Sequence, residues 1–75
     1  MDQTALLNQL ATTERHIAEG QQHLRRQRQH VSSLERRDPG SQTLKRAVAM
    51  LASMERRQRN HIDHRDRLKR TLEEG

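Results

Sequence analysis

Five histidines occur at spacings that can place several of them on one side of a helix. His16, His23 and His30 are seven residues apart, and His61 and His64 are separated by about one helical turn. Neutral imidazoles at such spacings can bind zinc or copper, which makes His16, His61 and His64 the candidate ligands. The sequence has no cysteine and lacks the Glu-x-x-His and His-Glu-x-x-His pairs of di-iron and zinc enzymes. We therefore expect no metal site, and interpret the histidines as residues that flank a packed seam.

The same imidazoles predict a response to pH. Histidine is the side chain whose charge ordinarily changes between pH 5 and pH 8. Up to five added positive charges beside an apolar seam would repel one another. We therefore expect association of the protein to loosen at pH 5.

Basic residues are concentrated in the middle of the chain. The protein has 15 Lys and Arg against 10 Asp and Glu, a net charge of +5. Residues 25–59 carry a net charge of +7, whereas residues 1–24 carry −2 and residues 60–75 carry zero. Because guanidinium groups suit phosphate, the candidate polyanion-binding residues are Arg25, Arg26, Arg28, Arg56, Arg57 and Arg59. The alternative interpretation is a solvated face that keeps a weakly hydrophobic protein soluble.

Few other residues could carry chemistry. The absence of Phe, Tyr and Trp disfavours base stacking on single-stranded nucleic acid, so any DNA or RNA would be bound through its phosphates. The serines have no His and acid partners in a pocket, and the chain has no Gly-rich phosphate loop. We expect a protein that is not an enzyme, uses no cofactor and binds no small-molecule substrate.

Two helices must position these residues. Leu, Ile, Val and Phe make up only 13 of the 75 residues, which is typical of disorder, but the apolar residues recur with heptad spacing in two long stripes. This periodicity favours helices. The candidate core and interface residues are Leu10, Ile17, Leu24, Val31, Leu51, Met54, Ile62 and Leu68.

The break between the helices is predicted at residues 38–40. Pro39 cannot continue a helix, and Gly40 permits a positive φ. The candidate caps are Ser41, Asp38 or Thr43 for the second helix and Asp2 or Thr4 for the first. The sequence therefore predicts one domain over residues 1–75, with a helix at about 4–37, a turn at 38–40 and a helix at about 41–73.

A short connection forces two neighbouring helices to run antiparallel. In that arrangement the two stripes match layer by layer, with apolar layers at both ends and polar residues in the middle. Gly20 then faces Gln58, and Met50 and Met54 are expected to fill the core. The predicted fold is an all-α, coiled-coil-like antiparallel two-helix hairpin.

A single hairpin of this composition is only marginally stable, because its few aliphatic residues bury little surface relative to the entropy lost on folding. A second, thinner seam runs beside the first and contains Leu7, Ala11, Ala18, Val48, Ala52 and Ile62. We expect another helix to cover it. That helix comes either from a second copy, which gives a homodimeric four-helix bundle, or from a partner protein.

The sequence also bears on location. The longest apolar run, Ala47–Ala52, spans six residues and is far too short to cross a membrane. The polar start of the chain, residues 1–4, does not resemble a signal peptide. We expect a cytoplasmic protein without membrane contact.

Three short segments carry a resemblance to known proteins: residues 14–20 (ERHIAEG), residues 34–36 (LER) and residues 64–68 (HRDRL). With them, nearly the whole chain resembles a set of short, uncharacterised proteins of alphaproteobacteria. The resemblance implies a bacterial helical hairpin and no particular activity. In architecture, though not in motifs, the predicted hairpin is also similar to the plasmid copy-number regulator Rop, whose paired hairpins bind RNA.

These observations predict a non-enzymatic module for protein interaction or oligomerisation. The alternative is polyanion binding, to DNA or RNA phosphates, by the basic half of the hairpin next to the turn.

Overall fold

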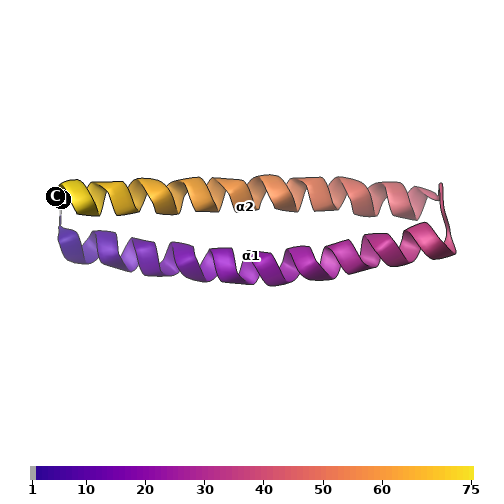
Figure 1. Ribbon diagram of the computed structural model, residues 1–75, viewed down its shortest axis with the longest axis horizontal. Helices are drawn as coiled ribbons and strands as arrows, with labels where there is room; N and C mark the ends of the chain where they lie inside the picture. The colour runs from indigo at the N-terminus through magenta and orange to yellow at the C-terminus, as the bar shows by residue number, and fades with distance from the viewer. Residues whose placement is uncertain (1) are drawn as a thin grey trace.

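Two long helices lie side by side in opposite directions, as the heptad stripes and the short turn between them predict. The computed structural model describes residues 2–75 and contains α1 (Gln3–Arg37) and α2 (Gln42–Glu74), packed into a rod 53 Å long (Figure 1). The predicted all-α, two-helix arrangement is therefore confirmed. The observed helix ends lie within one residue of the predicted ones.

Two side chains cap the N-termini of the helices, and a glycine forms part of the turn between them. Asp2 caps α1 by accepting a hydrogen bond from the backbone N–H of Thr4 at 3.1 Å. Ser41 caps α2 in the same way, its hydroxyl accepting from the N–H of Leu44 at 3.0 Å. Between the helices, Gly40 has a φ of 79°, a conformation that glycine adopts without steric cost. The turn therefore occupies residues 38–41, with the serine as the cap.

Burial follows the predicted seam. The buried residues of α1 and α2 are spaced by three, four or seven positions, or by larger intervals of the same heptad pattern: Leu6, Thr13, Ile17, Leu24, Val31, Leu34, Ala47, Gln58 and Leu68. Next to the turn, Val31, Leu34 and Ala47 form an apolar cluster that Leu44 and Leu51 complete. The apolar part of the core is thus densest at the closed end of the hairpin.

The middle of the seam is polar and hydrogen-bonded. Gln58 is buried, and its Nε2 donates to the backbone carbonyl of Ile17 at 2.8 Å. Gly20 lies directly opposite, and a Cβ atom there would overlap the side-chain amide of Gln58. Gln27 makes a second bond between the helices, its Nε2 donating to the carbonyl of Ala47 at 2.9 Å. Over residues 2–75, no buried side-chain nitrogen or oxygen lacks a hydrogen-bond partner.

The hairpin leaves several large apolar side chains in solvent. Leu7, Val48 and Met50 are 51 %, 46 % and 57 % exposed, and no side chain of the described residues is fully buried. The expectation that Met50 fills the core is wrong. Met50 immediately precedes the seam residue Leu51, and the 100° rotation between successive helical residues turns it away from the opposite helix.

Candidate interaction surface

Two narrow surfaces border the seam, one on each side of the hairpin. Residues immediately after the seam residues, such as Leu7, Arg28 and Val48, lie on one side, which we call the second-seam flank. Residues immediately before other seam residues, such as His16 and Met50, lie on the opposite side, which we call the histidine flank. The ion pair between Arg28 and Glu55 joins the helices across the first, and a shallow groove follows the second.

The groove of the histidine flank crosses the polar middle of the hairpin. It is lined by His16, Glu19, Gly20, His23, Met50, Met54, Arg57, Gln58 and His61. The rings of His16 and His61 lie 5.4 Å apart and are tilted by 38°. Each comes from a different helix, so the antiparallel register alone brings them together.

The structure places two of the three candidate metal ligands side by side. His16 and His61 are in ring contact, whereas His64 is exposed and does not line their groove. Within residues 2–75, no group of three or more His, Asp or Glu side chains is arranged to hold a metal ion. The groove of the histidine flank is lined by imidazole, carboxylate and guanidinium groups beside two methionines.

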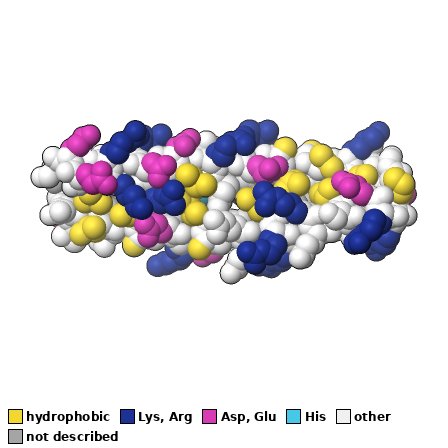
Figure 2. Space-filling model, viewed as in Figure 1, with side chains coloured by type: hydrophobic (Ala, Val, Ile, Leu, Met, Phe, Trp, Pro, Cys, Tyr) yellow, Lys and Arg dark blue, Asp and Glu magenta, His cyan; other side chains and the backbone are white. Residues whose placement is uncertain are grey.

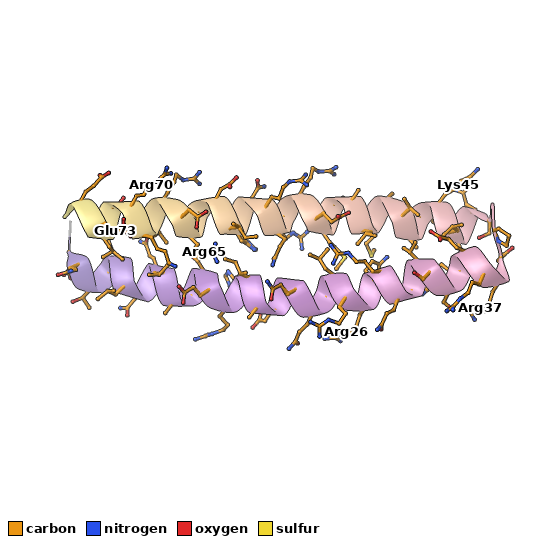
Figure 3. The ribbon with its side chains drawn as sticks, in the orientation of Figure 1. Arg26, Arg37, Lys45, Arg65, Arg70 and Glu73 are labelled. Atoms are coloured by element: carbon orange, nitrogen blue, oxygen red, sulfur yellow. The ribbon has the colours of Figure 1, made fainter. Side chains whose placement is uncertain are left out.

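The candidate polyanion-binding arginines surround the hairpin instead of sharing one face. Arg25 and Arg28 line a hollow on α1, while Arg57 lines the groove of the histidine flank. Arg26 points away from α2, as Figure 3 shows. The guanidinium of Arg56 donates to the hydroxyl of Ser53 at 3.2 Å. Arg59 is exposed as well, so the six side chains form a girdle around the rod.

Few of these charges are neutralised within the chain. Among residues 2–75, the structure records two ion pairs, Arg28 with Glu55 at 3.8 Å and Arg65 with Asp66 at 3.1 Å. Only the first involves a member of the arginine girdle. Figure 2 shows Lys and Arg patches over the length of one face, interspersed with hydrophobic side chains.

The candidate core and interface residues divide by burial. Ile17, Leu24, Val31 and Leu68 are buried in the seam, whereas Leu10, Leu51, Met54 and Ile62 are half-buried. Ile62 differs from the others because it lies on the second-seam flank, directly after the seam residue His61. The seam is thus occupied by the hairpin's own packing.

Sequence reasoning missed the hydrogen bonds that cross the seam. It placed Gln58 opposite Gly20, but the bonds from Gln58 to the Ile17 carbonyl and from Gln27 to the Ala47 carbonyl were not predicted. The available signal was a long amide at a seam position facing a glycine, since the missing Cβ exposes the backbone behind it.

The hollow on α1 and the groove of the histidine flank are both shallow and open to solvent. Neither α1 nor α2 contains a stretch that is long and apolar enough to cross a membrane. The chain matches no protein-family model, no curated protein and no solved structure.

Proposed function

We propose that this protein is a non-enzymatic helical interaction module, a hairpin that associates with further helices to form a four-helix bundle. The observation that supports this most directly is the exposure of Leu7, Val48 and Met50, while no side chain within residues 2–75 is fully buried. Because the core of the hairpin is small, covering these apolar side chains with another helix would stabilise the folded protein.

The size of this gain favours association. Covering the exposed half of a Leu, Val or Met side chain contributes about 1 kcal/mol. A symmetric dimer uses each contact twice, so covering Leu7 and Val48 contributes about 4 kcal/mol toward association. The seam of the hairpin stays intact, because the exposed residues lie on its flanks.

Sedimentation equilibrium between about 5 and 200 μM tests the proposal, since this range brackets micromolar association. We expect the mass to rise from one chain to two. The double variant Leu7→Gln with Val48→Gln should stay monomeric and helical. Ala49→Gln is the matched control because Ala49 is also exposed but faces away from both flanks. A wild-type mass of one chain throughout, in pure protein and in its host's extract, would refute the module.

A second function has its own supporting observation. Residues 25–59 carry a net charge of +7, and within the arginine girdle the structure pairs only Arg28 with a carboxylate. We propose, as the alternative, that the basic half of the hairpin binds polyanions such as duplex DNA or structured RNA. Contacts of guanidinium groups with phosphates would supply the affinity, without readout of sequence.

Fluorescence anisotropy with a DNA duplex and an RNA hairpin, at about 50 and 200 mM salt, tests this alternative. We expect affinity to fall by an order of magnitude or more at the higher salt, because bound phosphates release counterions. Arg25→Glu with Arg56→Glu should weaken binding, whereas Arg67→Glu with Arg70→Glu, in the neutral segment, should weaken it less. Absence of binding at the lower salt would eliminate the alternative.

A further inference from the structure

We infer that the partner is a second copy of this chain, bound antiparallel through the second-seam flank, with the turn of one hairpin beside the chain ends of the other. The inference rests on the proposed self-association and specifies its interface and direction. It follows from the order of apolar and charged residues along the flank, and from the hollow on α1.

The flank is complementary to itself only in certain registers. In the hairpin, Gly20 lies level with Gln58, which fixes the height of every other residue along the rod. A two-fold axis across the rod places α1 against α1 of the second copy and α2 against its α2. With that axis at the height of Ala18, Leu7 comes level with the hollow on α1 of the second copy. The same axis brings Ala11 level with Arg25 of the second copy, where the small side chain leaves room for the guanidinium.

Small residues let the two copies approach where they cross the axis. Ala18 would face Ala18 of the second copy, and Ile62, half-buried on the same flank, lies within about one helical turn of that height. Leu7 and Val48, the larger exposed side chains of the flank, would then seal the two ends of the interface. The contact is isologous, as expected of a homodimer.

Charge selects the antiparallel direction over the parallel one. The half of the hairpin next to the turn, residues 25–59, carries +7, while the remaining residues carry −2. A parallel dimer places the two basic halves together. The antiparallel dimer instead brings Arg25 within about one helical turn of Glu14 of the second copy, and Arg36 near Asp2.

The shape and area of the flank are sufficient for a dimer. A hollow on α1, lined by residues that include Leu24, Arg25 and Ser32, lies at the height that the second copy's residues 7–14 would occupy. The rod measures 53 Å by 14 Å, so one face offers roughly 700 Å², near the roughly 800 Å² per partner of a standard interface.

Cysteine cross-linking tests the direction, and the chain has no native cysteine to interfere. Ala11→Cys protein, labelled with ¹⁵N, is mixed with unlabelled Arg25→Cys protein in a glutathione redox buffer, and the covalent products are weighed by mass spectrometry. We expect heterodimers to exceed each homodimer by about tenfold, because only the mixed pair is held together. Thr4→Cys with Ser32→Cys is a second pair, for use if the first weakens association.

The outcomes separate this inference from the function on which it rests. Homodimers in excess would show a parallel dimer and overturn the inference. So would random products, or none from either pair, in a protein that sedimentation shows to be dimeric. A wild-type chain that stays monomeric would instead remove the self-association itself.

A charge swap gives an independent readout. Glu14→Arg or Arg25→Glu alone should raise the dissociation constant of the dimer by roughly tenfold, and the two together should restore it to within about threefold. Arg26→Glu, next in sequence but turned away from the flank, is the matched control. If the double variant is weaker than both single variants, the predicted contact does not exist.

Discussion

The closed end of the hairpin and its middle are held together by different interactions. Near the turn, Val31, Leu34 and Ala47 bury apolar surface in a small cluster. Eleven residues from Val31 and from Ala47, toward the chain ends, the facing pair is Gly20 and Gln58, and the main contact is a hydrogen bond from an amide to a backbone carbonyl. One region removes hydrocarbon from water, and the other satisfies polar groups at fixed positions.

The difference separates stability from register. Apolar burial is not directional, so a leucine cluster tolerates small shifts of one helix along the other. A hydrogen bond from Gln58 to the Ile17 carbonyl requires one distance and one angle. We infer that the closed end supplies most of the folding free energy, while the middle selects the layer at which the helices pair.

The largest effect is expected at the closed end. Leu34→Ala removes a buried side chain from the apolar cluster and should lower the free energy of unfolding by about 3 kcal/mol. Met50→Ala, at an exposed position, should change it by less than about 0.5 kcal/mol. Urea denaturation followed by circular dichroism, at one protein concentration, measures both. Equal losses would contradict the assignment of stability to the cluster.

The middle should show strong coupling between two residues. Gly20→Ala improves helix propensity by about 1 kcal/mol, yet its Cβ displaces the Gln58 amide from the Ile17 carbonyl. We expect Gly20→Ala to destabilise wild type but to stabilise the Gln58→Ala variant, with a coupling energy of about 2 kcal/mol in a double-mutant cycle. Additive effects would show that the close approach does not fix the register.

The two helix caps extend the comparison to the ends of the rod. Ser41→Ala should lower the free energy of unfolding by about 1 kcal/mol, because the hydroxyl bound to the Leu44 N–H holds the closed end beside the apolar cluster. Asp2→Ala should lower the free energy of unfolding by about half as much, since the open end can fray without disturbing the seam. Thermal melts of both variants measure the difference. A larger loss for Asp2→Ala would show that the open end contributes more to stability than the closed end.

The sequence was sufficient for the helices, their ends and their alignment. Heptad spacing predicted the stripes through Ile17 and Leu68, and Pro39 with Gly40 predicted the break. These features are local: a period of 3.6 residues, a proline ring and a serine hydroxyl act on the backbone of their own segment. The facing of Gly20 and Gln58 then followed from the short turn, which leaves the second helix little freedom.

What the sequence could not determine is where flexible side chains go once the helices pair. Composition suggested that Met50 would be buried and that six arginines would act as one group, but the structure exposes the methionine and distributes the arginines around the rod. The hydrogen bond from Gln58 to the Ile17 carbonyl is likewise seen only in the structure. Such choices depend on the space and the partners that the opposite helix offers, and those exist only after the two helices have packed.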